Sequence, residues 1–198
     1  MRRVGMVFAV AFALLAFAAP VAADTVPGPG PGERPRETFE ATGFDAFTSE
    51  CGQMTCTDTF VYAEEVTTSE GTFEYVCVDR YTYNMRTGRT VSYESGCTDT
   101  TNLTVSNDLS SATLAPTQVE LCARRACDTV TVSAELQATG GSSTFRSRYT
   151  ERDGTCTYTY SDSGRSSHGT GTITLDGDTM SAEGSIREYT STFSQRCR

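Results

Sequence analysis

The chain has 198 residues and a formal net charge of −9, with 25 acidic against 16 basic residues and no tryptophan. This length suits one ordinary domain or two small ones. An acidic sequence without a basic stripe argues against a nucleic-acid-binding protein and against a protein that binds anionic lipid headgroups.

The N-terminus has the pattern of an export signal. Two arginines precede an apolar run, Val4–Ala19, and small residues at Val21–Ala23 form a cleavage site before Asp24. The run is shorter than the roughly 20 residues that a membrane-spanning helix needs. We therefore expect residues 1–23 to be a signal peptide, and the mature protein to be secreted to the extracellular space without a membrane anchor.

Residues 24–43 are predicted to form a disordered, Pro/Gly-rich leader. Proline alternates with glycine over Pro27–Gly32, and the charged run Glu33–Glu37 follows. Such a segment has little apolar surface to bury, so it behaves as a linker or a tail. The β domain is expected to span residues 44–198.

From Phe44 onward, apolar and polar residues alternate with a period of two, which predicts β-strands. The clearest case is Asp128–Ala138, in which every second residue from Val130 is apolar. A strand gathers such a set on one face, whereas a helix would scatter it around its circumference. Similar alternation occurs in four further segments, at residues 72–78, 101–106, 155–161 and 171–175.

Residue pairs typical of turns separate these segments. They are Thr87-Gly88, Asn107-Asp108, Gly140-Gly141, Asp153-Gly154 and Asp176-Gly177. Short strands at this spacing, with no convincing amphipathic helix, indicate an all-β fold, an antiparallel sandwich or barrel that is stabilised by disulfides.

The sequence also suggests an internal repeat. Cys51–Cys56 recurs as Cys122–Cys127 at an offset of 71 residues, and Leu103–Ala112 resembles Ile173–Ala182 at an offset of 70. Two separated matches at nearly the same offset predict two related halves packed as one pseudo-symmetric unit. The predicted halves span about residues 51–121 and 122–197.

All eight cysteines follow the predicted signal peptide: Cys51, Cys56, Cys77, Cys97, Cys122, Cys127, Cys156 and Cys197. An even count in an exported chain indicates structural disulfides, and neither C-x4-C spacing fits a zinc site. A C-x4-C segment can face itself across a hairpin loop, and one pair lies symmetrically about the Thr87-Gly88 turn. We therefore expect a sequential scheme of bridges, 51–56, 77–97, 122–127 and 156–197.

No catalytic, metal-binding or cofactor-binding constellation stands out. The single histidine, His168, lies in a Ser/Gly-rich segment that we expect to be a loop, without a nucleophile-elbow motif beside it. The adjacent carboxylates Glu64 and Glu65 would point to opposite faces of a strand, so they are a poor pair for glycoside hydrolysis. Asp176–Asp178 and Ser161–Gly164 offer oxygen ligands for calcium, but hairpin turns explain them more simply. A non-enzymatic protein without a cofactor is therefore favoured.

The most suggestive local feature is the pair Arg124 and Arg125, which lies inside the Cys122–Cys127 segment of an acidic chain. A bridged loop would present these two cations to an acidic partner, or to the primary pocket of a trypsin-like protease. The sequence predicts a secreted, non-enzymatic binding or structural module whose partner is an extracellular protein or a glycan. The alternatives are a protease inhibitor acting through the arginine loop and, ranked last, a hydrolase that uses carboxylates.

Overall fold

The structure is a computed structural model that describes residues 36–123 and 126–197; the side chains of Arg36, Asp153 and Cys197 are outside the description. The described chain forms ten strands and no helix, so no helix in this part is long and apolar enough to cross a membrane. The strands are β1 (Arg36–Cys51), β2 (Thr55–Thr68), β3 (Gly71–Asn84), β4 (Thr90–Asp99), β5 (Leu103–Val105), β6 (Ser111–Ala123), β7 (Ala126–Ala138), β8 (Ser143–Asp153), β9 (Cys156–Leu175) and β10 (Asp178–Cys197).

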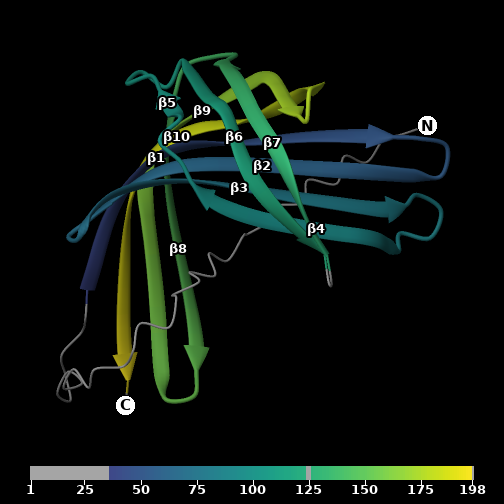
Figure 1. Ribbon diagram of the computed structural model, residues 1–198. Coiled ribbons are helices and arrows are strands. Elements are labelled where there is room, and N and C mark those ends of the chain that lie inside the picture. The colour runs from purple at the N-terminus through teal and green to yellow at the C-terminus, as the bar shows by residue number, and fades with distance from the viewer. Residues whose placement is uncertain (1–35, 124–125, 198) are drawn as a thin grey trace, which may run out of the picture.

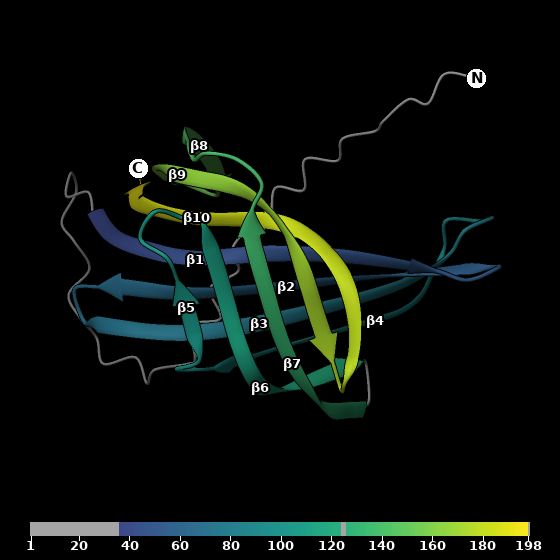
Figure 2. The ribbon, with the colours of Figure 1, turned by 90° about the horizontal axis from the view of Figure 1, so that it is seen from above.

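The strands form one antiparallel sheet that closes on itself. The hydrogen-bonded order runs β10-β1-β2-β3-β4-β6-β7-β9, and β10 also pairs with β9, which completes a ring. β5 pairs with β6, and β8 pairs with β9, both outside this ring. The predicted all-β antiparallel class is therefore confirmed, and of the two predicted architectures the closed one is present (Figure 2). Closure satisfies backbone groups that an open sheet would expose at its edges.

Small aliphatic side chains fill the interior of the ring. On β7, the alternating set predicted from the sequence points inward, and Val132 and Leu136 are fully buried. Phe44 is the single aromatic ring of the buried cluster. The core is continuous across the ring strands, and its members are Phe44, Ala46, Val61, Ala63, Val76, Val78, Leu109, Ala112, Leu114, Val119, Leu121, Val130, Val132, Ala134, Leu136, Ile173, Leu175, Ala182 and Ile186.

Long strands extend beyond the ring as two arms (Figure 1). The β8–β10 arm consists of β8, residues 156–166 of β9 and residues 187–197 of β10, with the first half of β1 alongside. The β1–β4 arm consists of the ends of β1 to β4 that point the other way, and Figure 1 shows it running to the right while the β8–β10 arm runs downward. The two arms share one sheet, so each face of the ring continues onto both arms.

Two predicted loops are strands. β1 already begins at Arg36, inside the segment predicted as a leader; residues 24–35 are outside the described part. β9 runs without interruption through Ser161–Gly164 and His168, which were expected to be turns or loops. Pairing with β10 along the whole of β9 supplies the backbone hydrogen bonds that make this polar, glycine-rich stretch a strand. Both strands depend on partners far along the chain, which local composition does not reveal.

The predicted turns and most of the predicted disulfides are confirmed. Four of the five turn pairs lie between strands, and the fifth, Asp153-Gly154, begins at the last residue of β8. Gly88, Gly154 and Gly177 have the positive φ that such turns need. The bridges Cys51–Cys56, Cys77–Cys97 and Cys122–Cys127 are present, each joining directly opposed residues of neighbouring strands. The register also places Cys156 opposite Cys197, but the side chain of Cys197 is outside the described part, so this bridge stays a prediction.

The internal repeat stays a hypothesis. The two C-x4-C segments close the ends of the β1–β2 and β6–β7 hairpins. The other matched segments, Leu103–Ala112 and Ile173–Ala182, lie at the turns of the β5–β6 and β9–β10 hairpins. These matches reflect similar local structure, and they do not by themselves establish two related halves.

Candidate functional site: the outer aromatic face

The outside of the sheet carries nearly all of the aromatic rings in the described part of the chain. Because directly opposed residues of antiparallel strands project to the same face, the register assigns every side chain to one side. By this criterion all nine tyrosines of the chain lie on the face that points away from the ring interior. We call this surface the outer aromatic face, and its rings are Phe39, Phe47, Phe60, Tyr62, Phe73, Tyr75, Tyr81, Tyr83, Tyr93, Phe145, Tyr149, Tyr158, Tyr160, Tyr189 and Phe193.

These rings contact one another across the strands. On the β8–β10 arm, Tyr149, Tyr160 and Phe193 form one cross-strand row, with centroid distances of 6.3 Å between the two tyrosines and 5.0 Å from Tyr160 to Phe193. On the β1–β4 arm, the Phe47 and Phe60 rings are 4.8 Å apart. Such pairs stabilise strands that extend beyond the core. Some of the rings remain open to solvent, since Tyr149 is 55% exposed.

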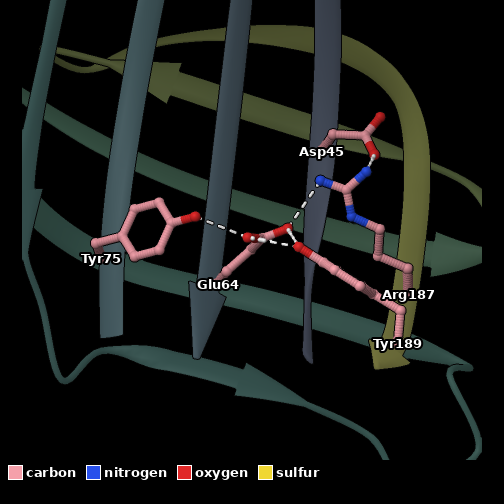
Figure 3. Close-up of polar contacts among 5 residues, drawn as sticks. All are labelled: Asp45, Glu64, Tyr75, Arg187 and Tyr189. Atoms are coloured by element: carbon pink, nitrogen blue, oxygen red, sulfur yellow. Dashed lines mark hydrogen bonds and ion pairs between the residues drawn. The ribbon is translucent and has the colours of Figure 1, made fainter. Parts of the chain in front are cut away.

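A buried polar cluster lies in this face where the two arms meet (Figure 3). One cross-strand row runs from Tyr75 on β3 through Glu64 on β2 and Gly43 on β1 to Arg187 on β10. Gly43 has no side chain, so Glu64 reaches across β1 and meets Arg187. A Cβ at Gly43 would lie 2.1 Å from the carbonyl oxygen of Ala63 and 2.7 Å from the Glu64 Cγ, which is too close for any larger residue.

Glu64 is the centre of this cluster, which we call the Glu64 cluster and which comprises Asp45, Glu64, Tyr75, Arg187 and Tyr189. The Tyr75 hydroxyl donates to Glu64 Oε2 at 2.7 Å, and Arg187 Nη2 donates to Oε1 at 2.8 Å. The Tyr189 hydroxyl lies 3.2 Å from both carboxylate oxygens. Arg187 also pairs with Asp45 Oδ1 at 3.3 Å and lies over the Tyr189 ring, 5.7 Å from its centroid. Three donors thus converge on one carboxylate whose side chain is only 3% exposed.

The electrostatics keep both tyrosines neutral and the arginine charged. Burial, reinforced by the Glu64 carboxylate, raises the pKa of Tyr75 and of Tyr189 well above the usual range. Burial alone would lower the pKa of Arg187, but the charges of Glu64 and Asp45 outweigh it and raise that pKa above its ordinary value. Burial raises the pKa of Asp45, and Arg187 only partly offsets this. The cluster is therefore an ion pair supported by two hydroxyl donors.

This arrangement suits a structural role better than proton transfer. The Glu64 oxygens are occupied by donors and shielded from solvent, so they do not offer a base to a substrate. Glu65 is exposed and projects to the other face, as the sequence predicted for the adjacent pair. Within the described residues, Arg187 Nε is a buried donor without a hydrogen-bond partner. The cluster ties β2 and β3 to β10 across β1, and so it fixes the corner between the two arms.

The other predicted site residues are not members of this cluster, although His168 lies in the same cross-strand row as Asp45, with Ser185 between them. His168 is an exposed residue in the middle of β9, opposite Ser185, and the neighbouring Ser167 is buried. Asp176 lies in the β9–β10 turn, where its carboxylate accepts a hydrogen bond from the Thr131 amide at 2.8 Å. Arg124 and Arg125 are outside the described residues.

One group of potential metal ligands occurs in the described part of the chain, and it is not a thiolate site. Glu120, Cys122 and Cys127 have ligand atoms within 4.8 Å of one another. Both sulfurs, however, belong to the Cys122–Cys127 disulfide. An oxidised sulfur is not the thiolate that binds zinc.

The Glu64 cluster is not apparent from the amino-acid sequence. Glu64 has acidic Glu65 beside it and resembles an ordinary surface residue until Gly43 and Arg187 are placed next to it. One signal was present in the sequence, namely that the tyrosines repeat at every second position in segments such as Tyr81–Tyr83 and Tyr158–Tyr160. Because residues two positions apart on a strand project to the same side, this spacing could have indicated one aromatic face on each strand.

Comparisons with known proteins give no match: no family model, no curated protein and no solved structure is similar to this chain. Any functional assignment therefore depends on the residues themselves.

Proposed function

We propose that this protein is a secreted, non-enzymatic binding module that holds a glycan chain on its outer aromatic face. The observation that carries the proposal is the gathering of all nine tyrosines on one side of the sheet, away from the hydrophobic core. Aromatic rings offer flat apolar surfaces on which sugar rings can stack, and tyrosine adds a hydroxyl that can hydrogen-bond to the sugar.

Polar groups beside the rings favour a glycan as the ligand. On the β1–β4 arm, the Tyr93 hydroxyl donates to Asp79 Oδ1 at 2.9 Å, and Tyr93 is 52% exposed. Asp58 accepts from the Ser49 hydroxyl at 2.6 Å on the same face. Carboxylates and hydroxyls placed between exposed rings match the hydroxyl groups that surround the apolar faces of a sugar. Binding sites that stack rings and fix orientation with a few polar groups are typical of small-molecule recognition.

The secreted location is part of the same proposal. The N-terminal residues 1–23 have the pattern of an export signal, and three disulfides are consistent with an oxidising compartment. N-terminal sequencing of the protein from the culture medium of its source should give Asp24 as the first residue. Recovery of the uncleaved chain from the cell interior would contradict this part of the proposal.

The glycan proposal is tested by a glycan array together with pull-down on insoluble polysaccharides. The variant Tyr149→Ala/Tyr160→Ala removes two neighbouring, exposed rings, and Met85→Ala removes an exposed apolar side chain in the β3–β4 turn as a matched control. Two ring contacts of about 0.5–1.5 kcal/mol each predict a loss of binding on the order of tenfold for the first variant alone. An absence of any glycan ligand, or equal binding by both variants, would refute the proposal.

A second candidate function has one supporting observation. The Cys122–Cys127 bridge closes the loop that contains Arg124 and Arg125, as a preorganised protease-inhibitor loop would require. A trypsin-inhibition assay decides this case. We would abandon inhibition if micromolar protein left trypsin fully active, or if Arg124→Ala/Arg125→Ala inhibited as well as the wild type.

A further inference from the structure

β8 has two chemically different sides. Phe145 and Tyr149 belong to the outer aromatic face, whereas Arg146, Arg148 and Arg152 alternate with them and project to the opposite face. All three arginines are exposed, and none of them forms an ion pair with another described residue. β8 is also the last strand of the sheet order, so the stripe lies along an open edge of the β8–β10 arm (Figure 1).

Neighbouring strands extend this positive surface. Arg196 on β10 lies in the same cross-strand row as Arg152, with Thr157 between them. Arg165 on β9 shares the face, where Glu188 holds it at 2.7 Å. We call this surface the arginine face, and its described cations are Arg146, Arg148, Arg152, Arg165 and Arg196. Within the β8–β10 arm and the first half of β1, the anions on this side are Glu40 and Glu188, so five positive and two negative charges leave a local excess of three among the described side chains. The chain as a whole carries −9.

Hydroxyl groups fill the rows between these cations. A shallow hollow of about 450 Å³ lies on the arm, and it is lined by Arg146, Ser147, Arg148, Ser161, Asp162, Ser163, Thr190 and Thr192. The Asp162 carboxylate accepts hydrogen bonds from the hydroxyls of Ser147 and Ser191. A guanidinium group binds a carboxylate, sulfate or phosphate through two parallel hydrogen bonds, and adjacent hydroxyls can donate to the remaining oxygens. The hollow therefore offers donors for an anionic group. The sequence-based premise that the chain has no basic stripe is wrong, because the strand register gathers arginines that composition does not reveal.

The shape and chemistry of the arginine face select among anionic partners. From Arg146 to Arg152 the stripe spans about 20 Å, given a rise of roughly 3.4 Å per residue, which suits a linear chain with repeated charges. Single-stranded nucleic acid is bound by a positive groove together with aromatic rings on which its bases stack, and the tyrosines all lie on the other face. A lipid surface is bound more firmly when apolar side chains insert, and the rows between the arginines contain serine and threonine instead.

We propose that the arginine face binds an acidic polysaccharide, a linear glycan that carries sulfate or carboxylate groups. Together with the outer aromatic face, this gives the β8–β10 arm two opposed binding surfaces that can hold two chains at once. The sheet keeps the two surfaces on opposite sides, so neither ligand blocks the other. The arginine-face inference does not depend on the glycan function proposed for the outer aromatic face, because the two proposals rest on different side chains.

The test measures binding to dextran sulfate and to polygalacturonate, with unsulfated dextran as the neutral probe, over a range of salt concentrations. Arg146→Ala/Arg148→Ala should weaken binding to both acidic chains on the order of tenfold and should lower the slope of log affinity against log salt by about two. The control Arg86→Ala/Arg89→Ala removes the same charge from exposed positions near the β3–β4 turn and should keep the wild-type affinity and slope. All four sites are exposed, and unchanged melting temperatures verify folding.

Three results would overturn the inference. The first is an equal loss of affinity in the control variant, which would make the effect one of net charge. The second is tighter binding of oligoglutamate, a charge-matched DNA strand or anionic vesicles than of the acidic polysaccharides. The third is loss of the acidic polysaccharide in Tyr149→Ala/Tyr160→Ala, which would mean that both glycan classes use the outer aromatic face. If only the glycan test of the outer aromatic face fails, the arginine-face inference remains supported.

Discussion

Replacing Arg187 with methionine should strongly destabilise the protein, because it leaves the Glu64 carboxylate buried without its cation. The Glu64 side chain is 3% exposed, whereas the Asp45 side chain is 44% exposed, so water can reach Asp45 more easily than Glu64 when Arg187 is lost. Removing one partner of a buried ion pair costs about 3–5 kcal/mol. Arg187 itself is 32% exposed, so water can partly replace it, and we expect about 3 kcal/mol. For a domain of this size, that corresponds to a fall in melting temperature of roughly 6–12 °C.

Urea unfolding of the oxidised protein measures this effect. The matched control is Arg165→Met, because the Arg165–Glu188 pair has nearly the same separation, 2.7 Å against 2.8 Å, but its carboxylate is 38% exposed. Surface ion pairs contribute little, so the control should unfold close to the wild-type midpoint. In a Glu64→Gln background, Arg187→Met should be much less damaging, since no buried charge is left unpaired.

Two outcomes would show that the reasoning on the Glu64 cluster is wrong. One is a similar loss of stability in Arg187→Met and in the exposed control. The other is a cost of Arg187→Met that is unchanged when Glu64 is glutamine, which would mean that packing of the arginine stem, and not its charge, stabilises the corner between the arms.

Three more predictions follow from the same contacts. Phenolate absorbance should show that Tyr75 and Tyr189 ionise only when the protein unfolds. Because their folded pKa values lie above 10.0, the free energy of unfolding should fall as the pH rises past 10. Ionisation of all tyrosines in a single transition of the folded protein would contradict this. Gly43→Ala should cost about 1–3 kcal/mol through overpacking, whereas Gly140→Ala, with nothing within 4 Å, should be neutral in the same denaturation assay. Replacing both cysteines of the Cys77–Cys97 bridge by serine should cost about 3 kcal/mol for its 20-residue separation, and an unchanged melting temperature would disprove that estimate.

The strands, the turns and the hairpin disulfides were predictable from local sequence patterns, namely the alternation of polarity, the turn residues and the cysteine spacing. In Asp128–Ala138 the alternation already identifies the buried face, because the apolar side chains lie on one side of the strand and that side packs in the core. The Thr87-Gly88 pair fixes a hairpin, and the hairpin then places Cys77 opposite Cys97. These features involve short stretches of chain, in which the covalent geometry and the side-chain period already limit the choices.

The candidate site could not be predicted in the same way. Glu64 and Arg187 are 123 residues apart, and they meet only because β1 lies between their strands with a glycine at the point of contact. Likewise, the Ser/Gly-rich part of β9 resembles a loop until β10 pairs with it along its full length. Such contacts are decided by the long-range register, which local propensity does not encode.

The sequence by itself thus determined the strand class, the position of the turns, the sequential disulfides of the hairpins and the acidic character of the chain. Only the tertiary structure decided that the sheet closes into a ring, which side of each strand faces inward, and that the rings and the arginines of β8 belong to opposite surfaces. The physical reason is that, on a strand such as β8 with polar or aromatic side chains on both sides, alternation separates two faces without saying which of them continues the interior face of the ring. That choice is made by the neighbouring strands, and here most of the decisive neighbours are distant in the sequence.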